Sequence, residues 1–332
     1  MRPLDITVLG AGILGLWQAL TFARRGHRVR LIEASAEPFA DAASRFAGAM
    51  LAPYCEEEAA EPVVADLGIE AMSVWRETFP HITWAGTLVV AAPRDRSELA
   101  RFARLSRGHA TVDGAAIDRL EPDLAGRFAT GLYYAEEGHM SPAVALPYLL
   151  EACRKAGVEV VLGRKCEPKD VDGLVIDCRG LAAREDLPGL RAVRGERLLL
   201  RSREVRLTRT VRLLHPRHPL YVVPWGNGLF LVGATVIESE DWSAMTVRSA
   251  LELLGLAYAL HPGFGEAEIV ELGAGLRPAF ADNVPKVVVA SARHIHVNGA
   301  YRHGFLLAPA LARIAADLVE TGARHNRIVV DA

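Results

Sequence analysis

The first 33 residues constrain the fold of this chain more than any other segment. Residues 6–9 are a short apolar run, which predicts a strand, and Gly10-Ala11-Gly12-Ile13-Leu14-Gly15 follows directly. A stretch with helical spacing comes next, and a second strand at residues 28–32 ends at Glu33. Glycines allow a tight turn, a helix N-terminus offers N–H groups to phosphates, and the terminal acid can accept from a ribose hydroxyl. Strand, turn, helix, strand and acid in this order predict a dinucleotide site.

An ordinary buried strand, turn and helix without a ligand is the alternative. It is less favoured, because three glycines in one turn cost backbone entropy that packing alone seldom requires. Glu33 disfavours a phosphorylated ribose, which would need a cation instead. A second glycine-rich run, Gly273-Ala274-Gly275-Leu276-Arg277-Pro278, has proline where the third glycine should stand. We therefore expect one dinucleotide site.

Composition excludes several other classes of protein. The chain has 332 residues, of which 51% are hydrophobic, so it can bury a large core in more than one domain. A net charge of -2 gives no basic excess for nucleic acid. No apolar run approaches the ~20 residues that span a bilayer, and the N-terminal run does not read as a signal peptide. We expect a cytoplasmic protein that binds neither nucleic acid nor membranes.

The four cysteines are scattered along the chain, without a Cys-x-x-Cys pair. Such spacing fits reduced thiols better than a disulfide framework or a zinc site, so we expect no metal. The cysteines are Cys55, Cys153, Cys166 and Cys178.

The pattern of elements predicts an α/β protein with interleaved domains. Helices alternate with strands near both ends of the chain, whereas the middle is rich in strands. We expect a Rossmann-like domain and a smaller α+β substrate domain with an antiparallel sheet. The first would use residues 1–80, 141–190 and 276–332, and the second residues 81–140 and 191–275. Because nicotinamide dehydrogenases usually keep this half contiguous, the division favours FAD over an exchangeable nicotinamide.

Several motifs together resemble one family. Ser44-Arg45-Phe46-Ala47-Gly48-Ala49-Met50-Leu51-Ala52-Pro53 resembles the second flavin-contact loop of the glycine oxidase (thiamine-biosynthesis) branch of the D-amino-acid oxidase superfamily. Gly275-Leu276-Arg277-Pro278 and the segment from Tyr301 to Pro309 are similar to two C-terminal motifs of that branch. Tyr221-Val222-Val223-Pro224 followed by Val232-Gly233-Ala234-Thr235 is similar to its substrate-side strand pair.

The chain departs from the usual pattern of this branch at a few positions, which bear on substrate size. They are Trp225, Val236, His303 and the run Asp177-Cys178-Arg179-Gly180, which is closer to D-amino-acid oxidases.

The resemblance assigns roles to residues whose type alone leaves the role open. It implies that Arg277 clamps a substrate carboxylate, that Tyr221 donates to the same group, and that Arg302 is a second anion contact. Otherwise Arg277 could be a solvated arginine, Tyr221 a core tyrosine and His303 a structural histidine. The expected cofactor contacts are Gly10, Gly12, Ile13, Leu14, Gly15, Glu33, Ser44, Arg45, Gly48, Ala49, Met50, Cys166, Cys178, Gly180, Arg302, His303, Gly304, Phe305 and Leu306.

The C-terminal helix has an expected part in flavin binding. If the N-terminus of the helix from Leu306 points at the flavin, its dipole stabilises the reduced form. No cysteine follows Cys178, so the FAD is expected to be non-covalent.

The resemblance implies oxidative deamination of glycine or another small amino acid, with dioxygen as acceptor. The products would be an imine or oxo acid, ammonia and hydrogen peroxide, and the reaction would serve thiamine thiazole synthesis. Thiazole synthase is then an expected partner, and a homo-oligomer an expected assembly. Alternatives that stay open are a sarcosine or D-amino-acid dehydrogenase or oxidase using another acceptor, a nicotinamide dehydrogenase, and a non-catalytic dinucleotide-binding protein.

Overall fold

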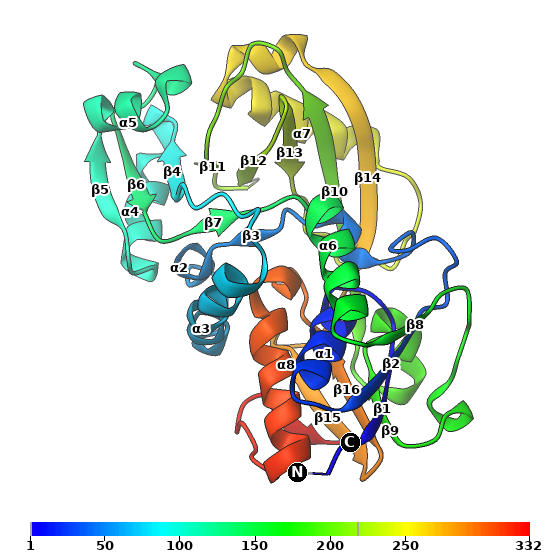
Figure 1. Cartoon of the computed structure of the whole chain (residues 1–332). Coiled ribbons are helices and arrows are strands. Elements are labelled where there is room, and N and C mark those ends of the chain that lie inside the picture. The colour runs from blue at the N-terminus through cyan, green and yellow to red at the C-terminus, as the bar shows by residue number, and fades with distance from the viewer. Residues whose placement is uncertain (1, 218) are drawn as a thin grey trace.

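The structure is a computed structural model that describes residues 2–217 and 219–332 (Figure 1). One of its two large sheets has seven strands in the order β17-β15-β16-β9-β1-β2-β8. All neighbours are parallel except β15 and β16. The strands are β1 (Asp5–Leu9), β2 (Arg28–Ile32), β8 (Glu159–Val161), β9 (Leu174–Asp177), β15 (Lys286–Ser291), β16 (His294–Asn298) and β17 (Val329–Asp331).

Four helices form one layer against this sheet and bury the largest hydrophobic core. They are α1 (Ile13–Arg24), α3 (Pro62–Thr78), α6 (Pro142–Lys155) and α8 (Gly304–Thr321). Leu16, Trp17 and Leu20 of α1 recur at helical spacing, and all three are buried. The indole N–H of Trp75 in α3 donates to the carbonyl of Phe305 at 2.8 Å, which ties α3 to α8.

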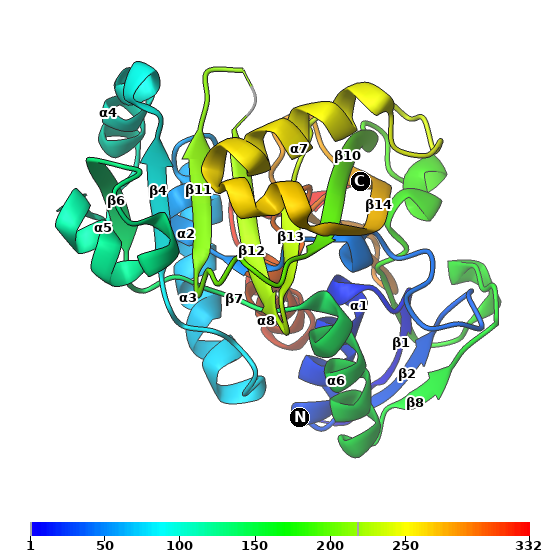
Figure 2. The same cartoon turned by 90° about the horizontal axis from the view of Figure 1, so that it is seen from above.

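The second sheet has eight strands in the order β14-β10-β13-β12-β11-β4-β6-β5, antiparallel except for the pair β11 and β4. Helix α7 (Val247–Leu260) lies over β10, β12 and β13 (Figure 2) and buries Leu253, Ala257 and Leu260 there. The strands are β4 (Thr87–Ala91), β5 (Ala110–Asp113), β6 (Thr130–Tyr134), β10 (Arg191–Arg201), β11 (Thr210–Leu214), β12 (Leu220–Gly226), β13 (Leu229–Gly233) and β14 (Glu268–Ala279).

Short elements complete the fold. Strands β3 (Met50–Leu51) and β7 (Gly138–His139) pair with each other, and the one-turn helix α2 (Pro53–Glu56) follows β3. Helices α4 (Arg96–Leu105) and α5 (Gly114–Leu120) lie beside β4, β5 and β6 at one end of the eight-stranded sheet (Figure 1). Among the described residues, no helix combines the length and the apolar character needed to cross a bilayer.

The α/β prediction is confirmed, with differences in detail. The helical spacing in the sequence predicts that this helix starts at Leu67, whereas α3 begins at Pro62, because proline suits the first turn of a helix. The sequence also predicts that Arg277 follows a strand, whereas β14 continues to Ala279 and Arg277 lies inside it. Pro278 is tolerated there because β14 is the edge strand of its sheet. The remaining domain boundaries stay a proposal.

Candidate active site

A cavity of about 1520 Å³ is lined by elements of both large sheets. One part of its wall is the glycine turn, which we define as Gly10 to Gly15, together with Glu33. Another part contains Tyr221 from β12, Arg277 from β14 and Arg302 from the segment before α8. The cavity therefore brings together two groups of predicted site residues that lie far apart in the sequence.

The glycine turn depends on the absence of side chains. Gly10 has a φ of +90°, and a Cβ atom there would lie 2.8 Å from the carbonyl oxygen of Cys178. At Gly15 a Cβ atom would lie 1.8 Å from the carbonyl oxygen of Gly10. Both clashes involve backbone, which cannot move aside as a flexible side chain can. Larger residues at either position would therefore break the close contact between β1, α1 and β9.

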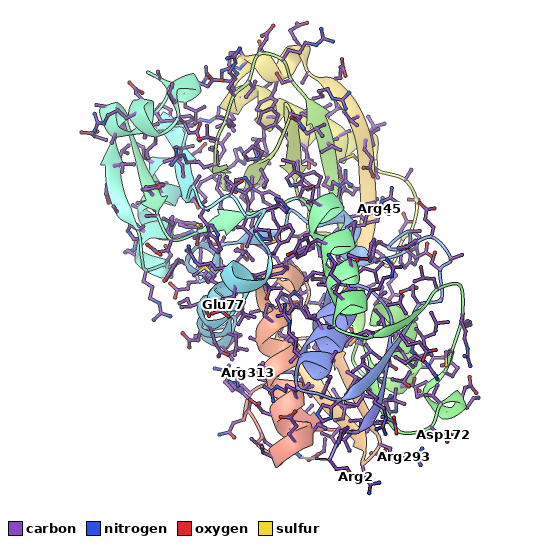
Figure 3. All side chains as sticks on the ribbon, in the orientation of Figure 1. Arg2, Arg45, Glu77, Asp172, Arg293 and Arg313 are labelled. Atoms are coloured by element: carbon purple, nitrogen blue, oxygen red, sulfur yellow. The ribbon has the colours of Figure 1, made fainter. Side chains whose placement is uncertain are left out.

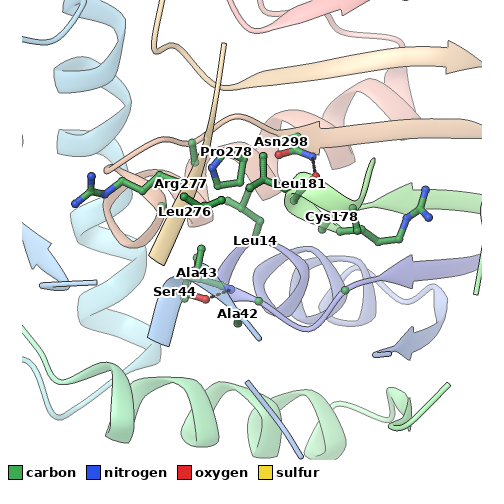
Figure 4. A pocket seen from close by; sticks show the side chains of 18 of the residues that line it. Leu14, Ala42, Ala43, Ser44, Cys178, Leu181, Leu276, Arg277, Pro278 and Asn298 are labelled. Carbon is green, nitrogen blue, oxygen red and sulfur yellow. Dashed lines mark hydrogen bonds between the residues drawn. The ribbon is translucent and has the colours of Figure 1, made fainter. Parts of the chain in front are cut away.

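The start of α1 is open toward the cavity. Its first-turn N–H groups have no acceptor within the helix, and only that of Ile13 is bonded to a side chain, donating to Ser44 Oγ at 3.2 Å (Figure 4). Glu33 accepts from the backbone N–H of Ala11 at 2.7 Å and of Ser35 at 3.0 Å. A carboxylate has about four acceptor positions, so Glu33 can still accept from a ligand hydroxyl.

Arg277 is a cation without an acidic partner. Its guanidinium lies against the backbone of Gly195 in β10, where a Cβ atom would be 1.9 Å from Nη2. Nη1 donates to the carbonyl oxygens of Thr235 at 3.2 Å and Arg194 at 3.4 Å. Within residues 2–217 and 219–332, no Asp or Glu forms an ion pair with it. Burial lowers its pKa, and the nearby charge of Arg302 adds to this. An anionic ligand would relieve both effects.

Two glycines pack closely against the side chain of Tyr221. A Cβ atom on Gly48 would lie 3.1 Å from Cε2 of Tyr221, and one on Gly233 would lie 3.1 Å from its hydroxyl. In the part of the chain that the structure describes, this hydroxyl makes no hydrogen bond. Its ring is thus fixed, and its O–H can donate to a ligand in the cavity.

Arg302 is bound to a buried acid that the sequence analysis did not single out. Glu56 in α2 accepts a hydrogen bond from Arg212 Nη2 of β11 at 2.7 Å and forms an ion pair with Arg302, whose Nη2 lies 2.9 Å from its Oε2. Burial would raise the pKa of Glu56, but the charges of Arg302 and Arg212 outweigh it and hold the pKa well below its usual range. We call Glu56, Arg212, Arg277 and Arg302 the arginine cluster. Part of the hydrogen-bonding capacity of Arg302 is therefore used within the protein.

His303 is buried next to the same carboxylate, with Nδ1 3.5 Å from Glu56 Oε2. Burial lowers its pKa to about 4, so the ring is neutral at pH 7. A structural role, rather than proton transfer at neutral pH, fits this position.

Most of the predicted site residues line the cavity, but two do not. Gly15 lies beneath the turn against Gly10, and Arg45 points outward beside β14, 4.0 Å from Glu271 (Figure 3). Arg45 is therefore not part of the cavity wall. The others line it: Gly10, Gly12, Ile13, Leu14, Glu33, Ser44, Gly48, Ala49, Met50, Cys166, Cys178, Gly180, Tyr221, Arg277, Arg302, His303, Gly304, Phe305 and Leu306.

The sequence analysis also missed Phe46 and Asn298 in the cavity wall. The Phe46 ring covers Gly275, and Asn298 donates to the carbonyl oxygen of Gly180 at 2.9 Å (Figure 4). Phe46 lay within a quoted motif and could have been chosen. Glu56 opens a run of three glutamates, which reads as a solvated surface and carries no signal of burial.

Comparison with known proteins places the whole chain in one group. A sequence model of the family described as FAD dependent oxidoreductase matches residues 5–318. A Rhizobium etli protein, named as a candidate thiamine biosynthesis oxidoreductase (ThiO), is 51% identical over 326 residues, covering 97% of this chain and 99% of that protein. The bifunctional protein ThiO/ThiG of Synechocystis is 26% identical over 355 residues, covering 95% of this chain and 51% of that protein.

The fold has a counterpart among solved structures. Glycine oxidase from Geobacillus kaustophilus superposes with a TM-score of 0.79 at 22% identity, covering 96% of this chain and 95% of that one. The two folds are therefore alike over nearly their whole length.

Proposed function

This chain belongs to the FAD dependent oxidoreductase family, and we propose that it oxidises glycine or another small amino acid. The observation that carries the proposal is Arg277. It lies in the same cavity as residues of the glycine turn, and no acidic partner for it occurs among the described residues. An amino acid would bring the missing carboxylate. The reaction converts the amine, dioxygen and water into an oxo acid, ammonia and hydrogen peroxide by way of an imine.

The residues present fit FAD. The glycine turn leaves the backbone bare, the first-turn N–H groups of α1 can bind a pyrophosphate, and Glu33 has free acceptor positions for a ribose. The volume of about 1520 Å³ exceeds the roughly 300–1,000 Å³ of a pocket for one drug-sized ligand. It has room for a dinucleotide and a small substrate. We propose that the FAD is non-covalent, because no cysteine follows Cys178.

The chain acts mainly by positioning its substrate. Arg277 binds the carboxylate, ideally through two parallel hydrogen bonds, and Tyr221 donates to the same group. This fixes the Cα–H in one direction, and such positioning accounts for much of the rate in reactions of this kind. Bound FAD would supply the acceptor for the hydride. No side-chain base is assigned, since His303 is neutral at pH 7 and contacts Glu56.

The names of the relatives support a place in thiamine biosynthesis. The Rhizobium etli protein carries that name, and the Synechocystis protein combines ThiO with ThiG in one chain. We propose that the imine product serves thiazole formation and that a thiazole synthase is a partner of this cytoplasmic enzyme.

Anaerobic titration of the purified flavoprotein with glycine, sarcosine and D-alanine tests the proposal. Loss of the flavin absorbance with at least one of them is expected, and oxygen uptake with peroxide formation should follow in air. If none reduces the flavin, the proposed function is wrong. Bleaching without oxygen uptake would instead identify a dehydrogenase that uses another acceptor.

A further inference from the structure

Two histidines and one aspartate converge on two neighbouring inner strands of the seven-stranded sheet. Asp177 is the last residue of β9, and His294 and His296 lie on the adjacent strand β16. His296 Nδ1 is 3.4 Å from Asp177 Oδ2, and His294 Nε2 is 3.7 Å from the same oxygen. One ligand atom from each of the three residues lies within 4.8 Å of the other two.

His296 is left without hydrogen-bond partners in this position. Its side chain is 0% exposed, neither ring nitrogen makes a hydrogen bond, and His294 Nε2 also has none. Buried polar groups nearly always have a hydrogen-bond partner, so these unpaired ring nitrogens need an explanation. The distances of 3.4 and 3.7 Å are too long for good hydrogen bonds. They are close to the separation of about 3.4 Å between two ligands of a tetrahedral ion with bonds of about 2.0–2.1 Å.

The surrounding charge favours a divalent cation. Arg179 binds Asp177, with Nη2 2.7 Å from Oδ2 and Nε 3.0 Å from Oδ1, and it also pairs with Glu167 and Asp186. Three carboxylates and one guanidinium sum to a formal charge of -2. A carboxylate has about four acceptor positions, and Arg179 reaches both oxygens of Asp177, with its Nε also 3.1 Å from Oδ2, so an ion at Oδ2 would share that oxygen with Arg179.

We propose that Asp177, His294 and His296 bind one divalent transition-metal ion. Two imidazoles and one carboxylate are a donor set that suits Zn²⁺, Co²⁺ or Ni²⁺ rather than Mg²⁺ or Ca²⁺. His294 is 20% exposed and lines the cavity, which gives the ion a route to the site and a position for water. The ion joins β9 to β16 directly before Cys178 and Gly180 of the cavity wall. The scattered cysteines gave no reason to expect a metal, and this site uses none of them.

Zinc binding to the metal-depleted holoprotein tests the proposal independently of its activity. Equilibrium dialysis against Zn²⁺ followed by metal analysis should give one ion per chain in the wild type. The variants His294→Gln and His296→Gln should each bind at least tenfold more weakly. His81→Gln is the matched control, because His81 is exposed and lies elsewhere, and it should bind like the wild type. Co²⁺ should produce ligand-field bands at longer wavelengths than the flavin absorption in the wild type and in His81→Gln, but not in the two site variants.

The thermal midpoint gives a second readout. Zn²⁺ should raise it in the wild type and in His81→Gln, but not in His294→Gln or His296→Gln, since an ion that binds only the native state stabilises that state. Equal zinc content in the wild type and both site variants, or no stoichiometric zinc in the wild type, overturns the proposal. If His296→Gln fails to fold, the more exposed His294→Gln decides alone.

Discussion

The glycine turn and the arginine cluster each contribute residues to the wall of the same cavity, but they are built in opposite ways. The turn is one contiguous run whose shape depends on backbone atoms 1.8 and 2.8 Å from positions where side chains would begin. The cluster draws on α2, β11, β14 and the segment before α8, and depends on charge pairing. Backbone shape is therefore encoded locally and is sensitive to a single methyl group. The charge network depends on residues far apart in the sequence, so single substitutions in it should lower stability in part rather than abolish the fold.

The largest effect is expected when a methyl group is added to the glycine turn. In Gly15→Ala the new Cβ would lie 1.8 Å from the carbonyl oxygen of Gly10, so β1 and α1 must separate. We expect the purified variant to misfold or to lose at least 90% of its bound flavin. A tenfold weaker affinity for flavin corresponds to about 1.4 kcal/mol. The ratio of flavin absorbance to protein absorbance measures this directly.

Gly255→Ala is the control for that variant. Gly255 lies in α7, and a Cβ atom there meets nothing within 4 Å. Alanine is the better helix former, by up to about 1 kcal/mol, so this variant should keep its flavin and be as stable as the wild type or more so. Full flavin content in Gly15→Ala would contradict the local account of the turn.

Removing the acid of the arginine cluster should have the next largest effect. Glu56→Gln leaves Arg212 and Arg302 without their anion, and breaking a buried pair in this way is destabilising by about 3–5 kcal/mol. Urea unfolding monitored by circular dichroism measures the change. Glu58→Gln is the matched control, since Glu58 pairs with the half-exposed Arg101 and such surface pairs contribute about 0–1 kcal/mol. Equal losses of stability in Glu56→Gln and Glu58→Gln would show that the buried ion pairs contribute no more than a surface pair.

This contrast explains how far the sequence could predict the molecule. Residues 6–33 predicted both strands, the helix and the turn, because each depends on neighbours in the chain. Glu56 could not be predicted, because its burial is set by Arg212 and Arg302, which are 156 and 246 residues away. Arg45 shows the converse: it belongs to a motif that lines the cavity, yet its own side chain points outward to Glu271. A motif locates a backbone segment more reliably than it locates a side chain.

Arg277→Met separates substrate binding from stability. Loss of the carboxylate clamp should weaken glycine binding by about 2–3 kcal/mol, or about 30- to 160-fold, seen in the glycine dependence of flavin reduction. The flavin content should be unchanged. Because Arg277 has no acidic partner in the described chain, the substrate-free variant should be at least as stable as the wild type. Arg302→Met, in contrast, leaves Glu56 with one partner fewer and should lower stability. A stability loss in Arg277→Met as large as that in Arg302→Met would remove the distinction between the two arginines.

The dependence of stability on pH tests the buried histidines. Burial lowers the pKa of His303 from 6.5 to about 4, and the same holds for His139. Below pH 6.5 the unfolded chain binds protons that the native chain does not, so native stability falls as the pH falls toward 4. Between pH 6.5 and 4.5 each histidine should contribute a loss of up to about 2–3 kcal/mol. The contribution of Glu56 is lost only below about pH 4.5, because its native pKa is held below that of the unfolded chain.

The variant His303→Gln tests this account. Between pH 6.5 and 4.5 its urea midpoint should fall about half as steeply as that of the wild type. An unchanged slope would mean that His303 is protonated in the native state, and that the neutral ring assigned to it beside Glu56 is wrong.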